Sequence, residues 1–161
     1  MEFIPFKPEH AETITTWFRT RDEFLAWGGR VFHWPLTAES ICQRSKEENL
    51  KFYVLIDGEA LVGFIEINRV STTESRLCRV AVNPDIRGKG VGRKLVEFSM
   101  QQIRQDPAVE EVSLAVFHSN TSAKRCYDSV GFEVVDKAPY FKVFDGVEWP
   151  IYQMSYKLLA K

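Results

Sequence analysis

Three glycines at alternate positions, between an apolar segment and an amphipathic one, constrain this chain more than any other feature. The apolar segment, residues 76–82, is typical of a strand and ends at Asn83-Pro84, after which Gly88, Gly90 and Gly92 follow. Glycine lets the backbone turn tightly and leaves its N–H groups uncovered. A helix that begins there directs its unpaired N–H groups and its positive dipole end at the same point. The segment therefore predicts an anion site that suits a pyrophosphate.

Two common phosphate-binding loops do not match this segment. A Walker loop needs a glycine followed by Lys-Ser or Lys-Thr, and no glycine here has that neighbour. A Rossmann loop needs G-x-G-x-x-G and an acidic residue at the far end of the next strand, but here the spacing is G-x-G-x-G, and Glu110 and Glu111 lie at the start of that strand. A nicotinamide-dependent oxidoreductase is therefore only a minor alternative.

The glycine segment resembles the acetyl-CoA signature of the GNAT superfamily of N-acetyltransferases, [QR]-x-x-G-x-[GA]. The residues that supply this pattern are Arg87, Gly88, Gly90 and Gly92. A second segment is similar to the family's N-x-x-[AS]-x-x-x-Y-x-x-x-G-F motif, and its matching residues are Asn120, Ala123, Tyr127, Gly131 and Phe132. The two motifs occur in the family's order, and the resemblance covers essentially the whole chain.

Size and composition are those of one globular domain, residues 1–161, with 45% hydrophobic and 27% charged residues. The net charge of −1 gives no reason to expect nucleic acid or an anionic membrane as a partner. The sequence has no recognisable signal peptide and no apolar run long enough to span a membrane. Cys42, Cys78 and Cys126 are odd in number and widely spaced, which indicates free thiols in a reducing compartment such as the cytoplasm. No Cys/His spacing indicates a metal site.

The order of predicted elements is β-α-α-β-β-β-α-β-α-β-β, which is the order of the GNAT fold. That α/β fold has a mixed, mostly antiparallel sheet of about seven strands, flanked by four helices. The ranges are strand 2–6, a helix from Pro8 to near Arg21, a helix from Thr37 to about Glu48, strands 51–56, 60–68 and 76–82, a helix ending at 106–107, strand 112–117, helix 121–130, strand 132–135 and a hairpin of 140–144 and 148–158. Paired glycines and a proline argue against regular structure in residues 24–35.

The resemblance implies that acetyl-CoA is the cosubstrate and indicates how it is held. Backbone groups of Val80 and Val82 would pair with the pantetheine arm as an added strand. The Val82 amide, splayed by a bulge before Asn83-Pro84, would donate to the thioester oxygen. Asn120 would contact the pantetheine, and Lys124 would approach the phosphates of the nucleotide. The full set expected to bind the cofactor is Val80, Ala81, Val82, Arg87, Gly88, Lys89, Gly90, Val91, Gly92, Arg93, Asn120 and Lys124.

Acetyl transfer needs one group that protonates the departing thiolate and another that accepts a proton from the amine. Tyr127 is the expected general acid, since a phenol near pKa 10 can return a proton to a departing thiolate near 8.5; alternatively, Tyr127 only packs against Phe132. The glutamate that some family members place on the strand before the glycine loop is replaced here, near Arg76. Glu66 is the expected base, although an exposed position on its strand, in a salt bridge with Arg79, would explain it equally well. His118 and a water chain remain open as alternatives.

The acceptor site is expected in the aromatic run near residues 24–35. The expected substrate-binding residues are Trp27, Phe32, Trp34 and Tyr140; alternatively, the run is a loop packed on the core. These residues do not distinguish among small amines, amino acids, aminoglycosides and protein N-termini as acceptors. The expected function is acetyl transfer to an amino group by direct attack in a ternary complex, with a homodimer as a possible assembly. A CoA-binding regulatory module without turnover is the alternative.

Overall fold

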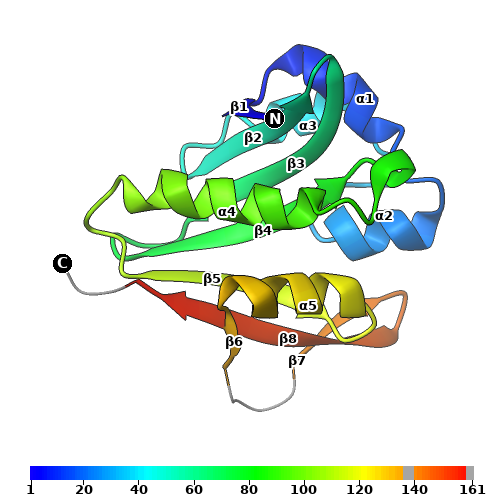
Figure 1. Ribbon diagram of the computed structural model, residues 1–161. Helices are drawn as coiled ribbons and strands as arrows, with labels where there is room; N and C mark the ends of the chain where they lie inside the picture. Colours follow the sequence, from blue (N-terminus) through cyan, green and yellow to red (C-terminus); the bar gives the residue numbers. More distant parts are fainter. Residues whose placement is uncertain (136–139, 159–161) are drawn as a thin grey trace.

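The structure is a computed structural model that describes residues 1–135 and 140–158. One eight-stranded sheet forms its centre, with strand order β1-β2-β3-β4-β5-β8-β6 and with β7 paired to β8 (Figure 1). The elements are β1 (Glu2–Pro5), η1 (Pro8–His10), α1 (Ala11–Thr15), α2 (Arg21–Gly28), α3 (Ala38–Arg44), β2 (Leu50–Asp57), β3 (Ala60–Arg69), β4 (Glu74–Val82), η2 (Pro84–Ile86), α4 (Val91–Arg104), β5 (Glu111–Phe117), α5 (Thr121–Val130), β6 (Glu133–Val134), β7 (Tyr140–Phe144) and β8 (Val147–Lys157).

The sheet opens between its two central strands. β4 and β5 are parallel, and their register covers only three pairs, from Glu74↔Glu111 to Arg76↔Ser113. Every other pairing in the sheet is antiparallel, and β5 stays paired with β8 along its whole length. Beyond Arg76 the two halves of the sheet separate, so the ends of β4 and β5 leave a gap between them (Figure 1).

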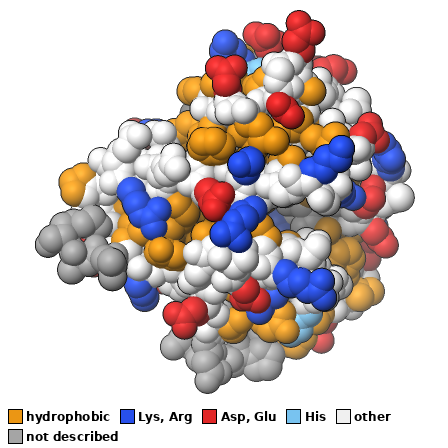
Figure 2. Space-filling view, in the orientation of Figure 1, with side chains coloured by type: hydrophobic (Ala, Val, Ile, Leu, Met, Phe, Trp, Pro, Cys, Tyr) orange, Lys and Arg blue, Asp and Glu red, His pale blue; other side chains and the backbone are white. Residues whose placement is uncertain are grey.

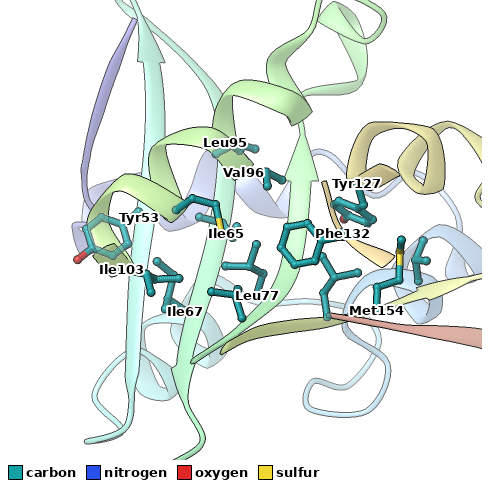
Figure 3. Packing of buried hydrophobic residues seen from close by; sticks show 14 of the residues in the cluster. Tyr53, Ile65, Ile67, Leu77, Leu95, Val96, Ile103, Tyr127, Phe132 and Met154 are labelled. Carbon is teal, nitrogen blue, oxygen red and sulfur yellow. The ribbon is translucent and has the colours of Figure 1, made fainter. Parts of the chain in front are cut away.

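Two hydrophobic cores cover the two faces of the sheet. One lies beneath α4 and α5, where Leu95 and Val96 of α4 pack toward Ile65 and Leu77 of the sheet (Figure 3). α4 contributes its buried residues along one stripe, as expected for an amphipathic helix that packs on a sheet. The other core lies beneath α1, α2 and α3, and it contains most of the buried aromatic residues of the N-terminal half. The opening between β4 and β5 therefore connects a face covered by α4 and α5 with a face covered by α2.

The N-terminal region contains one more helix than the sequence analysis predicts. The helix expected from Pro8 to near Arg21 ends at Thr15, and a separate helix, α2, begins at Arg21. The prediction of irregular structure for residues 24–35 is therefore wrong for its first five residues. A capping box explains α2, because the Thr20 side chain accepts from the Glu23 N–H and the Glu23 carboxylate accepts from the Thr20 N–H.

The remaining elements agree with the prediction apart from their ends and number. Thr37 caps α3 as expected, but that helix ends at Arg44, four residues before Glu48. Over residues 1–135 and 140–158 the sheet has eight strands where about seven were expected, and there are five α-helices where four were expected. Within the described part of the chain, no helix has both the length and the apolar character needed to cross a membrane.

Candidate functional site

The glycine loop and the start of α4 form a backbone surface of free N–H groups. Gly88 and Gly90 have φ angles of 84° and 76°, which glycine adopts without strain. The first backbone bond of α4 runs from the Lys94 N–H to the Gly90 carbonyl, so the three preceding N–H groups have no partner within the helix. Helices α2, α3 and α5 each begin with a side-chain cap, whereas α4 has none and carries no acid in its first turn. This helix start suits an anionic ligand.

Two of the cations expected around this surface are engaged elsewhere. Arg93 donates to Glu97 at 3.1 Å and to Ser129 at 2.7 Å, so it links α4 to α5. Lys124 lies 2.8 Å from Asp128, one turn along α5. Within the glycine loop and the first turn of α4, Arg87, Lys89 and Lys94 are exposed and form no ion pair with another described residue. On this face, Lys and Arg side chains are spread among hydrophobic and neutral ones (Figure 2).

A cavity of about 300 Å³ lies at the opening between β4 and β5. On one side its lining includes Leu77, Val116 and Tyr127, which belong to the core beneath α4 and α5. Arg76 also lines the cavity, and because successive residues of a strand point to opposite faces, it points to the α2 side, away from Leu77. The cavity therefore passes through the sheet, so that two ligands can meet in it from opposite faces.

The bulge in β4 lies earlier than expected. The register pairs Phe64 with Ala81 and Glu66 with Cys78, so Arg79 and Val80 together stand opposite a single residue of β3. Arg79 has a φ of 48°, and its carbonyl accepts a 2.8 Å hydrogen bond from the Trp27 indole N–H. A bulge before Asn83-Pro84 is therefore present, but the expectation that it splays Val82 is wrong, because the pairing with β3 resumes at Ala81 and continues to Val82, opposite Gly63.

Arg79 and Val80 line the cavity, and Val82 does not. The backbone groups released from β3 by the bulge are thus those at positions 79 and 80. Ala81 is buried in the core beneath α1–α3, and it also lies outside the cavity lining. Of the three β4 residues expected to meet a cofactor, the structure brings Val80 to the cavity.

Tyr127 and Asn120 reach the cavity from α5. Asn120 caps this helix by accepting from the Ala123 N–H at 3.3 Å, and Tyr127 lies two turns further along. The Tyr127 ring packs edge-on against Phe132, with ring centroids 6.3 Å apart, as the packing interpretation requires. Its hydroxyl has no hydrogen-bond partner among the described residues, yet it is not among the fully enclosed polar atoms, so it faces the cavity. Burial raises the pKa of the Tyr127 phenol well above its usual value of 10.0, which keeps the hydroxyl protonated.

Glu66 is fully buried between two arginines and lies outside the cavity lining. Arg79 donates to its carboxylate at 2.7 Å, and Arg44 of α3 donates to both carboxylate oxygens at 3.2–3.3 Å. The expected salt bridge with Arg79 is present, but Glu66 is 0% exposed rather than on the surface. This arrangement attaches α3 to the bulged part of β4 and leaves the carboxylate no open path to a substrate in the cavity.

We expect Glu66→Gln to lower the stability of the protein and to leave turnover by the folded protein nearly unchanged. Two nearly buried arginines would lose their anionic partner, which costs about 3 kcal/mol when a buried ion pair is broken. Thermal unfolding and kcat measured on the same preparation test this. Glu97→Gln, which breaks the half-exposed pair with Arg93, is the control and should change the unfolding free energy by less than about 1 kcal/mol. An unchanged melting temperature with a large loss of kcat would instead restore Glu66 as the base.

The other expected residues divide between the cavity and the rest of the molecule. Trp27 lines the cavity, whereas Phe32 is buried and stacks on Trp27 with centroids 5.4 Å apart. Trp34 and Tyr140 are 41% and 39% exposed and lie outside the lining. His118 is exposed, stacks on Tyr152 at 3.9 Å, and also lies outside it. Of the four aromatic residues expected to bind the acceptor, Trp27 alone lines the cavity.

The cavity contains polar residues that the sequence analysis did not assign to the site. Four cations line it, together with Gln153, and none of its lining residues among 1–135 and 140–158 is an aspartate, a glutamate or a histidine. The cations are Arg30, Arg76, Arg79 and Lys142. On β7, Lys142 lies between the exposed residues Phe141 and Val143 and is itself half-buried. Because successive side chains of a strand point to opposite faces, this alternation was the only local signal that Lys142 points into the molecule. Among the described residues no group of three or more His, Cys, Asp or Glu side chains is arranged to hold a metal ion.

Comparison with known proteins places the chain beside acetyltransferases. The sequence model described as "Acetyltransferase (GNAT) family" matches residues 12–132. The Escherichia coli K12 [Ribosomal protein bS18]-alanine N-acetyltransferase is 28% identical over 120 residues, which cover 74% of this chain and 79% of that protein. A Corynebacterium glutamicum mycothiol acetyltransferase is 28% identical over 123 residues, covering 74% of this chain and 41% of that protein.

Solved structures share the fold at low sequence identity. The spermidine N-acetyltransferase from Vibrio cholerae, in complex with CoA and spermine, superposes with a TM-score of 0.81 at 13% identity, covering 97% of this chain and 94% of that one. The ribosomal-protein-alanine N-acetyltransferase from Brucella melitensis has a TM-score of 0.79 at 16% identity and covers 98% of this chain and 100% of that one. The two-faced opening between β4 and β5 thus belongs to a fold shared along almost the entire chain.

Proposed function

The chain belongs to the acetyltransferase (GNAT) family, and we propose that it acetylates the amino group of a small molecule or a peptide by direct attack within a ternary complex. As a member of this family it is an N-acetyltransferase that uses acetyl-CoA as cosubstrate. The observation that carries the proposal is the cavity through the sheet, because it joins the face of the glycine loop and α4 to the face of α2. A ternary complex needs such a passage, since both substrates must reach one point.

Residues of the glycine loop and α4 fit the anionic part of acetyl-CoA. The open space at Gly88 and Gly90, the uncapped helix start and the cations Arg87 and Lys89 suit a diphosphate. Arg93 and Lys124 would serve only if they left their present partners. When bound, acetyl-CoA supplies an activated acetyl thioester. We assign contact with its pantetheine arm to Val80 and Asn120, because both line the cavity.

The bulge offers the most suitable donor for the developing oxyanion. Backbone N–H groups aimed at a developing negative charge are a major source of rate enhancement in acyl transfer. Because Arg79 and Val80 are released from β3 pairing and line the cavity, we assign this role to the bulge rather than to Val82. The positive φ of Arg79 is a strained conformation, which is common where a backbone group is aimed at a ligand.

Proton transfer is divided between Tyr127 and water. Tyr127 is protonated and its hydroxyl faces the cavity, so it can donate to the departing thiolate. No lining residue in the part of the chain that the structure describes carries a carboxylate or an imidazole, and Glu66 is enclosed by its arginines. We therefore assign removal of the amine's proton to water in the cavity, which is the remaining alternative from the sequence.

The relatives suggest the size of the acceptor but not its identity. Their names specify an alanine of a ribosomal protein, mycothiol and spermidine, which share an amino group and little else. A cavity of about 300 Å³ has room for a small amine or for one N-terminal residue of a peptide. Three free cysteines support a reducing compartment such as the cytoplasm, and the exposed apolar residues of the β7–β8 hairpin would support a homodimer.

Acetyl-CoA titration combined with a thiol-release assay distinguishes the enzyme from a regulatory module. We expect acetyl-CoA to bind in the micromolar range, NAD not to bind, and at least one primary amine in a mixed panel to release free CoA. Binding of acetyl-CoA without release, for every amine in the panel, would favour a CoA-binding regulatory module. Absence of binding to correctly folded protein would contradict both functions.

A further inference from the structure

We propose that the acceptor is an amine that also carries a carboxylate or a phosphate, and that this anionic group binds the cations on the α2 side of the cavity. The inference rests on the proposed function, because it concerns the acceptor of the same reaction. It begins from the charges around the cavity, where the described lining residues that carry charge are all cations: Arg30, Arg76, Arg79 and Lys142.

Only one of these four cations has an anionic partner among the described residues. Arg79 is paired with Glu66 at 2.7 Å. Arg76 donates to the Ser113 hydroxyl at 3.2 Å and to the Gln153 side-chain oxygen at 3.0 Å, and both are neutral. Arg30 and Lys142 form no ion pair in the described part of the chain. Arg76 and Lys142 are half-buried and Arg30 is exposed at the mouth of the cavity, so an anionic ligand bound there would offset the partial loss of solvation of the first two charges.

Lys142 shows how unfavourable this clustering is. The Lys142 ammonium, on β7, lies over the ring of Phe117, on β5, at 5.4 Å from the ring centroid. Burial, and then the positive charges of Arg30, Arg79 and Arg76, lower the pKa of Lys142 to about 8. The neighbouring Cys78 does not compensate, because burial raises the pKa of its thiol and keeps it neutral. Lys142 is thus charged near neutral pH but lacks an anion to stabilise that charge.

These cations are separate from those that face the diphosphate of the cofactor. Arg76 and Gln153 lie on the face opposite Leu77 and Met154, which belong to the core beneath α4 and α5. The glycine loop contributes no residue to the cavity lining, and it has Arg87, Lys89 and Lys94 of its own. The cofactor's phosphates therefore have a site on one face of the sheet. The cations on the α2 face would pair with a second anion, which the acceptor carries.

The same charges disfavour polyamines. A second ammonium group on the acceptor would lie near three unpaired cations, and repulsion between like charges at short range in a partly dry cavity is strong. Amines that carry a carboxylate, such as free amino acids, and amines that carry a phosphate ester are the two sources of the anionic group. Both would place their anion against Arg30, Arg76 or Lys142.

The first test measures anion binding without turnover. Sulfate and acetate, as probes of a tetrahedral and a planar anion, are titrated into the wild-type protein saturated with CoA, so that the α4 site is already occupied. We expect Lys142→Gln and Arg30→Gln to weaken binding of at least one probe about tenfold or more, as loss of a charge-assisted hydrogen bond does. Lys51→Gln, which removes an exposed cation outside the cavity, is the control and should change nothing.

The pH dependence of sulfate binding gives an independent readout. Sulfate keeps its charge between about pH 6 and 10, whereas Lys142 loses its proton as the pH rises through about 8. The affinity for sulfate should therefore be highest below this pKa and fall above it, and bound sulfate should raise the pKa of Lys142. Arg30, Arg76 and Arg79, which face Lys142, stay charged over the whole range, so Lys142→Gln should remove the pH dependence.

The second test compares acceptors that differ only in their anionic group. We expect alanine to exceed alaninamide, or phosphoethanolamine to exceed ethanolamine, by about tenfold or more in kcat/KM, and spermidine to be poorer than either favoured amine. A preference for alanine over alaninamide would identify a carboxylate as the anionic group of the acceptor. A preference for phosphoethanolamine over ethanolamine would identify a phosphate. Faster acetylation of alaninamide, ethanolamine or spermidine, with sulfate and acetate binding unaffected by the variants, would overturn the inference while leaving acetyl transfer intact. Variant-sensitive anion binding without acetylation of any amine would support the anion site and contradict the proposed function.

Discussion

Tyr127→Phe should lower kcat for acetyl transfer by about 10² or more and leave the Kd for acetyl-CoA nearly unchanged. A positioned general acid contributes about 10²- to 10⁴-fold to a rate. The Tyr127 hydroxyl is protonated, faces the cavity and makes no hydrogen bond to another described residue. Its removal therefore leaves no group unpaired and leaves the edge-on contact with Phe132 in place. The measurement is kcat from thiol release with the best amine of the panel, beside a calorimetric titration of acetyl-CoA.

Tyr53→Phe is the matched control for Tyr127→Phe. Tyr53 is also buried, burial also raises its pKa, and its ring also packs on an aromatic neighbour, Phe3, at 4.8 Å. It lies on β2, outside the cavity, so its substitution should leave kcat unchanged. Full activity in the Tyr127 variant, or an equal loss in both variants, would mean that the hydroxyl does not act as the acid and that Tyr127 serves packing alone.

The parts of the site that sequence alone predicts are those made by consecutive residues. The glycine loop, the start of α4 and the Asn120 cap of α5 each depend on a few neighbouring positions, and the structure has them at the expected residues. The capping box that starts α2 was equally local: Thr20 and Glu23 have the required spacing, but the paired glycines nearby favoured an irregular interpretation.

The parts that the sequence did not reveal depend on pairing between distant segments. The position of the β4 bulge is fixed by the register with β3, which releases the backbone at Arg79 and Val80 and keeps Val82 paired with Gly63. The partners of Glu66 come from α3 and β4, which meet only after the sheet has formed. The charge of the cavity arises in the same way, because Arg30, Arg76 and Lys142 come from three segments of the chain that the gap between β4 and β5 brings together.

Gly90→Glu should weaken acetyl-CoA binding by at least about 100-fold and leave the fold intact. Gly90 is the N-cap of α4 with a φ of 76°, and a Cβ built there meets no atom within 4 Å, so a larger side chain extends into the space where a diphosphate would lie. A glutamate there also places a negative charge at the positive end of the helix, where it competes directly with the phosphates. The left-handed conformation costs an ordinary residue about 1–2 kcal/mol, so some loss of stability is expected as well.

Gly58→Glu separates this strain from the loss of the site. Gly58 lies in the turn between β2 and β3 with a φ of 63°, and a Cβ there also meets nothing within 4 Å. Both variants should therefore lose similar amounts of unfolding free energy, while calorimetry should detect weakened acetyl-CoA binding only for Gly90→Glu. Equal affinities in the two variants and the wild type would show that the glycine loop does not hold the cofactor. Because Gly90 does not line the cavity that contains Lys142, Gly90→Glu should still bind sulfate there, which would establish that the two anion sites are independent.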